Sequence, residues 1–263
     1  MSGSGGADMI LALWLLAAFA LPLFPMGWLF NRVLASLPVG WPQALAVLLI
    51  PQLGVAALRA THEGWDLPSQ WAFYGALWVL LSALFYAFRA LSARELGIWT
   101  RLLASSGLAL TWLDWGSGAT WPATEVFVLS WSLPAALLLL LAGALTRRLG
   151  GAYLGLQGGL VAVLPRLTAS LTMCALALLA TPLFPGFFAL LRAFDRLPLA
   201  FVPLLMPLPL LWGWAAGRFF QDLLFGAYRG EPVTDLGRGP ALLIGIALAA
   251  FLFVSLLGSG VGL

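Results

Sequence analysis

The sequence predicts an all-α fold: a polytopic transmembrane helix bundle of about eight helices, with one broken helix near residues 181–187. Of its 263 residues, 62% are hydrophobic and only 9% are charged, whereas a soluble globular protein has roughly 25% charged residues. The mean hydropathy is +1.00. A chain of this size in water would have too few charges to cover its surface, so lipid is the solvent that suits it.

The apolar segments set the number of expected spans, because a helix needs about 20 apolar residues to cross the hydrocarbon core. We expect spans near 9–30, 41–59, 70–88, 99–115, 124–146, 167–192, 199–220 and 239–260. Residues 150–163 are apolar but rich in glycine, which predicts an interfacial or re-entrant connection, with a ninth span as the alternative. The first eight residues lack the basic region of a signal peptide, so we expect the first span to remain in the mature protein.

The arginines predict the orientation of the spans. All thirteen basic residues are arginine. The even-numbered loops and adjoining span ends hold only Arg59, Arg192 and Arg196, and the odd-numbered loops hold the other ten: Arg32, Arg89, Arg94, Arg101, Arg147, Arg148, Arg166, Arg218, Arg229 and Arg238. Short loops rich in arginine stay cytoplasmic. We therefore expect a multi-pass protein of the bacterial inner membrane with both termini on the outer, periplasmic side.

The sixth predicted span contains the string Thr181-Pro182-Leu183-Phe184-Pro185-Gly186. Proline removes a backbone donor and clashes with the preceding turn, so this string should interrupt the helix. A break at membrane depth persists only where protein or a water-filled cavity covers the freed backbone groups. The break is therefore either a kink that aids packing or part of a pathway. The candidate pathway or gating residues are Arg101, Thr172, Thr181, Pro182, Pro185, Gly186 and Glu125.

Few residues are available for catalysis or metal binding. The chain has one histidine, His62, and one cysteine, Cys174, in an apolar run. His62, Glu63 and Asp66 share a loop but lack the spacing of metal ligands. No nucleophile elbow, phosphate loop or catalytic triad is recognisable. We therefore expect no intrinsic enzyme activity, no cofactor, no metal site and no nucleic-acid partner.

Five strings follow one another between about residues 74 and 238. They are Arg101-Leu102-Leu103-Ala104-Ser105-Ser106-Gly107, the leucine run from Ala136 to Leu145, Gly158-Gly159-Leu160 with Pro165, Pro182 to Phe188, and Gly217-Arg218-Phe219-Phe220 with Phe225-Gly226. Their order resembles the C-terminal half of the antiporter-like membrane subunits of respiratory complex I (the M/N/L-like subunits of NADH-quinone oxidoreductase), Mrp antiporters and membrane hydrogenases. Residues 1–69 show no recognisable resemblance, so we expect N-terminal helices over 1–69 and an antiporter-like bundle over 70–263.

The resemblance implies a proton relay of buried ionisable groups, and this sequence departs from it. The family's lysine, histidine, second lysine and acid fall on or near Thr100, Trp131, Ala135 and Leu190, none of which can carry a proton. Glu125, Asp114 and Asp222 lie near predicted span ends, where we expect solvated charges. Arg101 is the best-placed charge for a structural or gating contact, with a snorkelling interfacial anchor as the alternative.

Three hypotheses follow. The first is a non-catalytic, degenerate subunit of a larger ion-translocating complex, either complex-I-like or hydrogenase-linked, or of an inorganic-carbon uptake complex that includes a cytoplasmic zinc protein. Its partners would be other membrane subunits, a cytoplasmic catalytic subunit and the lipid bilayer. The second is a transporter of protons or a small solute through the broken sixth helix. The third is a membrane assembly factor whose resemblance to the family arises from leucine-rich composition.

Overall fold

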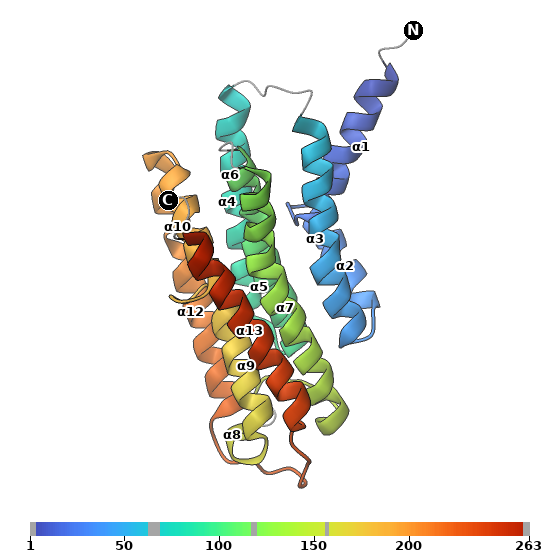
Figure 1. The fold of residues 1–263 in the computed structure, drawn as a ribbon, viewed down its shortest axis with the longest axis vertical. Helices are drawn as coiled ribbons and strands as arrows, with labels where there is room; N and C mark the ends of the chain where they lie inside the picture. The colour runs from blue at the N-terminus through green and yellow to red at the C-terminus, as the bar shows by residue number, and fades with distance from the viewer. Residues whose placement is uncertain (1–3, 63–68, 117–119, 156–157, 260–263) are drawn as a thin grey trace.

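The computed structural model describes residues 4–62, 69–116, 120–155 and 158–259. The described chain is an elongated bundle of helices, and its only extended pairing is a single bridge between Glu95 and Tyr153 (Figure 1). The prediction of an all-α helix bundle is confirmed. In chain order, the elements are α1 (Ser4–Ala20), α2 (Met26–Ser36), α3 (Trp41–His62), α4 (Ser69–Ala90), α5 (Leu96–Ala109), α6 (Thr111–Gly116), α7 (Trp121–Leu149), α8 (Leu160–Val163), α9 (Pro165–Leu178), α10 (Pro185–Arg196), the 3-10 turn η1 (Leu199–Phe201), α11 (Val202–Leu205), α12 (Pro207–Phe219), the π-helical turn η2 (Phe220–Leu224) and α13 (Arg238–Ser259).

Within the described residues, four apolar stretches are helical over enough length to cross a membrane: Trp41–Thr61, Phe73–Ala90, Trp121–Leu149 and Leu199–Leu224. Three of the other predicted spans are pairs of shorter helices. The sixth is α9 followed by α10, and the fourth is α5 followed by α6. The first, predicted as one span over 9–30, is wrong as a continuous helix. It divides into α1 and α2 because Pro22 and Pro25 interrupt it after Leu21.

The glycine-rich segment after α7 forms no further span in its described part. α7 ends at Gly150, whose φ of +75° is the left-handed conformation that commonly terminates helices. The one-turn helix α8 then leads directly into α9. The connection predicted over 150–163 is therefore found, and the alternative of a ninth span is not.

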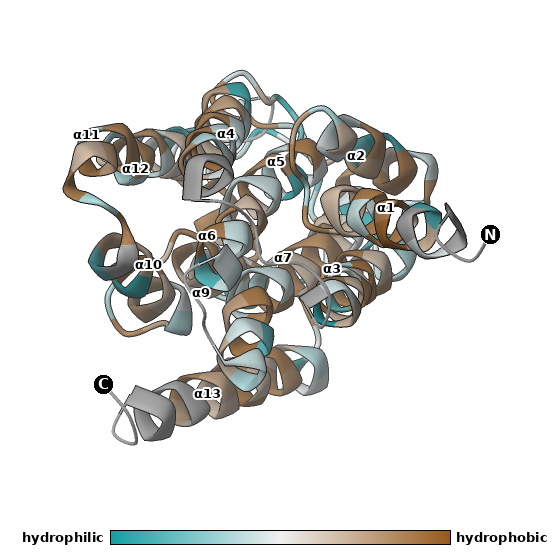
Figure 2. Cartoon of the chain, turned by 90° about the horizontal axis from the view of Figure 1, so that it is seen from above, coloured by the Kyte–Doolittle hydropathy of each residue, from teal (hydrophilic) through white to brown (hydrophobic). Residues whose placement is uncertain are grey.

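α7 is the central helix of the bundle. In the most apolar stretch of α7, 78% of the residues are buried inside the bundle. In the corresponding stretch of residues 199–224, only 33% are buried. α7 packs against α3, α5 and α9, so the fifth and sixth predicted spans are neighbours. Seen along the bundle, α1 to α3 lie on one side of α7, α10 to α12 on the other, and α13 at the edge (Figure 2). A Cβ on Gly143 of α7 would lie 2.6 Å from the Cα of Gly40, so this approach requires glycine.

The segment between η2 and α13 is fixed to the ends of α7 and α9. The Asp235 carboxylate accepts hydrogen bonds from the backbone N–H groups of Arg166 at 2.9 Å and Leu167 at 3.2 Å, in the first turn of α9. Arg148, near the end of α7, donates from Nε to the Thr234 carbonyl at 2.9 Å. Burial raises the pKa of Asp235, but its hydrogen bonds from the backbone of Arg166, Leu236 and Leu167, together with the Arg166 charge, leave the pKa below its ordinary value.

Candidate functional site

The break in the sixth span is built as a locally hydrogen-bonded turn. α9 ends at Leu178 and α10 begins at Pro185, and between them Ala180 and Leu183 have φ values of +52° and +105°. Thr181 donates from its backbone N–H and its hydroxyl to the Leu176 carbonyl, at 3.2 and 2.9 Å. These bonds satisfy a carbonyl at the end of α9, so this part of the break is stabilised by the chain itself.

The predicted pathway residues around this break do not form one polar surface. Pro182 is exposed, whereas Pro185 and Gly186 are buried. Thr172 and Thr181 are half-buried, and the Thr181 hydroxyl is already bonded to backbone. A Cβ on Gly186 would lie 3.4 Å from the Cα of Ala180, which places the two sides of the break in close contact. The geometry at these residues therefore agrees with a packed interruption.

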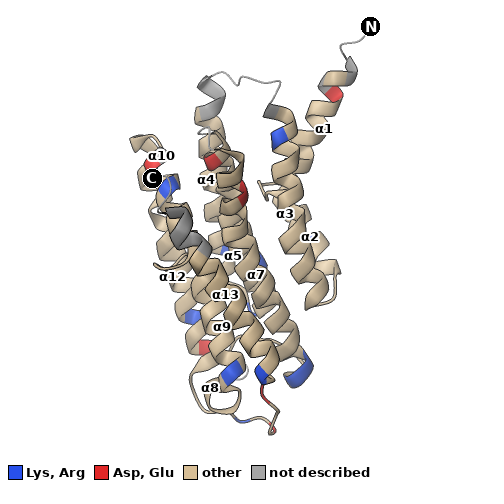
Figure 3. Ribbon diagram, in the orientation of Figure 1, with Lys and Arg blue, Asp and Glu red and all other residues tan. Residues whose placement is uncertain are grey.

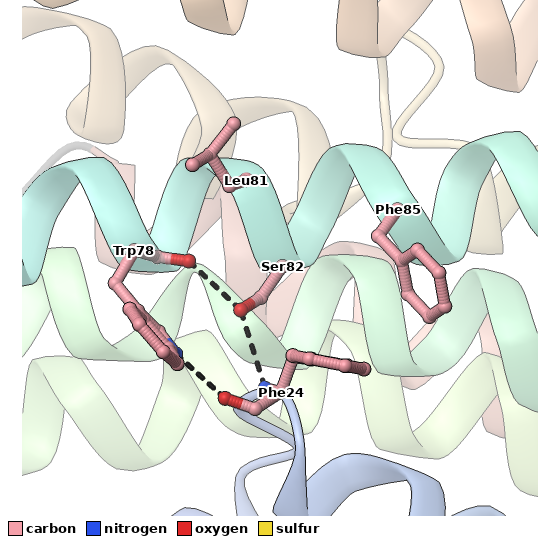
Figure 4. A pocket seen from close by; sticks show the side chains of 5 residues that line it. All are labelled: Phe24, Trp78, Leu81, Ser82 and Phe85. Carbon is pink, nitrogen blue, oxygen red and sulfur yellow. Dashed lines mark hydrogen bonds between the residues drawn. The ribbon is translucent and has the colours of Figure 1, made fainter.

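A second break, between α1 and α2, was missed from the sequence. The Phe24 backbone N–H donates to Ser82 Oγ at 3.2 Å, and Trp78 Nε1 donates to the Phe24 carbonyl at 2.6 Å (Figure 4). Both side chains come from α4, so a neighbouring helix satisfies the backbone freed here. The available signal was the string Pro22-Leu23-Phe24-Pro25, because the same four residue types recur at 182–185.

Buried hydroxyl and indole groups connect α5 to three other helices near the centre of the bundle. Asn31 of α2 donates to Ser105 Oγ at 2.8 Å. Trp212 of α12 donates to Ser106 Oγ at 3.0 Å, and Ser106 in turn donates to the Ala83 carbonyl of α4 at 2.8 Å. Both serines are fully buried. The centre of α5 is therefore polar but contains no titratable group in this network.

Arg101 lies one turn from this network, on α5. Its side chain is only 9% exposed, and its Nε has no hydrogen-bond partner among the described residues. Gly97 lies one turn before Arg101 on α5. A Cβ added to Gly97 would lie 3.4 Å from Glu95 Oε1 and 4.0 Å from Gln43 Oε1, so two side-chain oxygens are close to this turn of the helix. A buried guanidinium keeps its charge. The structure therefore places Arg101 inside the bundle.

Asp114 corrects one expectation about the acids. It is 2% exposed and accepts a hydrogen bond from Thr124 Oγ1 at 2.9 Å, so it is not a solvated charge at a span end. Its position inside the predicted span 99–115 was the signal that it could be buried. Glu125 is exposed on the first turn of α7, and Asp222 is partly exposed with an oxygen 3.8 Å from Arg218, as expected for charges near span ends.

The positions that the resemblance assigns to a relay face the interior. Thr100, Trp131 and Ala135 are completely buried, and Leu190 is 6% exposed. The Trp131 ring lies 5.0 Å from the ring of Trp212, centroid to centroid. The four positions are thus occupied by packed side chains without a proton-carrying group.

Within the described residues, no three His, Cys, Asp or Glu side chains lie together as metal ligands would. Cys174 is buried and makes no disulfide. Glu63 and Asp66 of the weak metal-site candidate lie outside the described residues.

Comparison of the whole fold with solved structures gives strong likenesses, and two of them have the same TM-score. A chain of respiratory complex I from Thermus thermophilus with bound NADH matches with a TM-score of 0.77 and 26% identity, over 92% of this chain and 54% of its own length. A chain of the Mrp complex from Dietzia sp. DQ12-45-1b matches with a TM-score of 0.77 and 17% identity, over 97% of this chain and 57% of its own. This chain therefore spans little more than half the length of the chains it matches.

A third likeness is to respiratory complex I from Thermus thermophilus with bound Aureothin, with a TM-score of 0.68 and 18% identity over 92% of this chain and 55% of that one. No protein-family model matches the sequence, and no curated protein does. A likeness that covers almost the whole chain is not explained by leucine-rich composition. By its fold, the chain is a multi-pass helical membrane protein of the kind found in respiratory complex I and the Mrp complex.

Proposed function

We propose that this chain is a non-catalytic membrane subunit of a larger antiporter-like complex and that it has lost its own proton relay. The proposal rests on the side chains that occupy the four interior positions to which the resemblance assigns a proton relay. Thr100, Trp131, Ala135 and Leu190 are buried, and none of them ionises in the physiological range. An ionisable group at membrane depth is costly and usually functional, so replacing all four by packed side chains favours a role in assembly over a role in conduction.

The host is proposed from the fold likeness to respiratory complex I and the Mrp complex together with the sequence resemblance. It is a complex-I-like or hydrogenase-linked ion pump, or an inorganic-carbon uptake complex with a cytoplasmic catalytic subunit. The chain would complete or stabilise a neighbouring subunit's path through its shape, with partners on the exposed sides of its peripheral helices.

Copurification tests this proposal. The chain, tagged at its natural level in its own membrane, is extracted in mild detergent and analysed by size-exclusion chromatography and mass spectrometry. We expect it to elute with other membrane subunits in a defined stoichiometry. The proposal is contradicted if the chain elutes alone as a monodisperse species and is as thermally stable after purification as it is in the membrane extract.

A second candidate is proton or small-solute transport through this chain, and one observation favours it. Arg101 Nε, Trp131 Nε1 and Ser132 Oγ are buried without a hydrogen-bond partner among the described residues, and Asp114 is buried on a neighbouring element. Buried polar groups of this kind are commonly satisfied by internal water.

Liposomes that contain only the purified chain separate the two candidates. Under an imposed pH gradient, a pH-sensitive dye inside the vesicles should report no flux above that of empty vesicles if the first proposal holds. Flux that is abolished by Asp114→Asn and retained in Glu125→Gln, its exposed neighbour on α7, supports the second candidate instead.

A further inference from the structure

The space beside Gly97, in the first turn of α5, is lined by polar atoms from two directions. Gly97 is buried, and a Cβ added to it would lie 3.4 Å from Glu95 Oε1 and 4.0 Å from Gln43 Oε1. Both separations are ordinary van der Waals contacts, so the position has room for a group about the size of a methyl. Glu95 directly precedes α5, and Gln43 lies in the first turn of α3. The missing side chain of Gly97 therefore leaves a small buried space with two side-chain oxygens on its wall.

Arg101 is placed to reach this space. It lies four residues after Gly97, so the two share a face of α5, and side chains in a helix lean toward its N-terminus. The Glu95 carboxylate is close enough to attract the Arg101 charge. Arg101 is buried, and its Nε–H has no hydrogen-bond partner among the described residues. The helix geometry therefore directs an unused donor of a buried cation toward the two oxygens.

Gln43 supplies a matching acceptor. Its side chain is 1% exposed, and its Nε2 donates to the Leu37 carbonyl at 2.9 Å. That bond fixes the orientation of the amide, because only the NH₂ end can donate to a carbonyl. Gln43 Oε1 is therefore the end near α5, and among the described residues it has no hydrogen-bond partner. An unused donor and an unused acceptor thus lie near the same glycine, and they are not bonded to each other.

We propose that one water molecule is bound beside Gly97, where it accepts a hydrogen bond from Arg101 Nε and donates to Gln43 Oε1 and Glu95 Oε1. The chemistry of the site selects water because the ligand must donate and accept and must be about the size of a methyl. It must also be neutral, since Glu95 repels an anion and Arg101 repels a cation. Buried waters typically make about three hydrogen bonds to polar groups that otherwise lack partners. The site joins α3 to α5 whether or not the chain conducts protons.

A high-resolution crystal structure of the chain, grown from a lipidic phase, tests the proposal directly. We expect a density peak for water within about 2.7–3.2 Å of both Arg101 Nε and Gln43 Oε1. The proposal is wrong if Arg101 Nε bonds directly to Gln43 or Glu95 and no peak lies beside Gly97.

Gly97→Ala tests the same site by thermal unfolding in detergent. The added methyl fits without a clash, and alanine favours helix over glycine, so filling an empty space should raise Tm. If water occupies the space, the methyl displaces it and leaves Arg101 and Gln43 without a partner, so we expect Tm to fall by several degrees. The matched control is Gly213→Ala on α12, where nothing lies within 4 Å and Tm should stay the same or rise. A rise in both variants contradicts the proposal. The density measurement decides if Gly97→Ala does not fold.

Discussion

Ser105, Ser106 and Trp212 illustrate how single residues stabilise the interior of this chain without ion pairs. Each hydrogen bond in a folded protein contributes about 1 kcal/mol net, but a buried polar group that loses its partner costs about 1–3 kcal/mol. Asp114, which is buried, also bonds to a short side chain, since it accepts a hydrogen bond from the hydroxyl of Thr124 at 2.9 Å. Substituting an individual buried donor should therefore lower the free energy of unfolding more than substituting an exposed charge.

Thr124→Val removes the hydroxyl that donates to Asp114 while keeping the shape of the side chain. We expect a loss of about 1–3 kcal/mol in unfolding free energy, because the buried carboxylate loses a donor. The apparent Tm in detergent, read from intrinsic tryptophan fluorescence, should fall by several degrees. Glu125→Gln, at the next and exposed position, should leave Tm unchanged. Equal Tm values for the two variants would show that the Thr124 contact does not stabilise the fold.

Gly107→Ala tests the close approach between α5 and α7. A Cβ at this position would lie 2.2 Å from two ring atoms of Trp131, which is itself fully buried. Overpacking of this kind costs about 1–3 kcal/mol, so Tm should fall. Gly217→Ala on α12, where nothing lies within 4 Å, should be neutral or slightly stabilising because alanine favours helix. Adding Trp131→Leu to Gly107→Ala should recover part of the loss, and its failure to do so would place the strain elsewhere.

At the scale of elements, proline strings interrupt two of the three predicted spans that are divided within the described residues, and the sequence predicted one of these two breaks. The run over 9–30 is so apolar that hydropathy describes it as a single span, whereas Gly186 directly after Pro185 marked the second break clearly. Element types and span positions follow from apolar length alone, so most of them could be predicted. The side of each helix that faces the interior could not be predicted, because nearly every residue is apolar and the sequence does not distinguish a lipid-facing leucine from a core leucine. For that reason Asp114 was misplaced, and the Ser105 and Ser106 contacts were not foreseen.

Asp235→Ala tests the attachment of the loop before α13 to the start of α9. The carboxylate accepts two N–H groups that α9 cannot satisfy itself, so its removal should cost about 0.5–2 kcal/mol, as loss of an N-cap does. The pKa of Asp235 is lowered in the folded chain, so its stabilisation is present above the ordinary aspartate pKa and is lost as pH falls through the folded value.

The Tm difference between wild type and Asp235→Ala should therefore be constant from about pH 5 to pH 7 and shrink below about pH 4. Thermal unfolding at pH 7, 5 and 3.5 measures it. Glu231→Ala, an exposed acid in the same segment, should leave Tm unchanged at all three. A difference that grows on acidification would mean that Asp235 is protonated in the folded chain.

At the scale of the whole molecule, the charges divide the bundle into two ends. The arginines gather at the end where α7 finishes and α9 and α13 begin, whereas few lie at the opposite end (Figure 3). Arginine-rich short loops remain in the cytoplasm. Two acids of the same end are held there, since Asp235 accepts hydrogen bonds from the first turn of α9 and Asp222 lies 3.8 Å from Arg218. The folded distribution agrees with the alternation counted along the sequence and makes the orientation of the chain testable.

Single cysteines read this orientation directly in intact cells, because the native Cys174 is fully buried and should not react. Asp195→Cys, exposed on α10, should be labelled by a membrane-impermeant maleimide from the outside. Glu231→Cys, exposed at the arginine-rich end, should react only after the membrane is permeabilised. The reverse pattern would put the ten arginines of the odd-numbered loops on the outer side, against the charge bias that orients membrane helices.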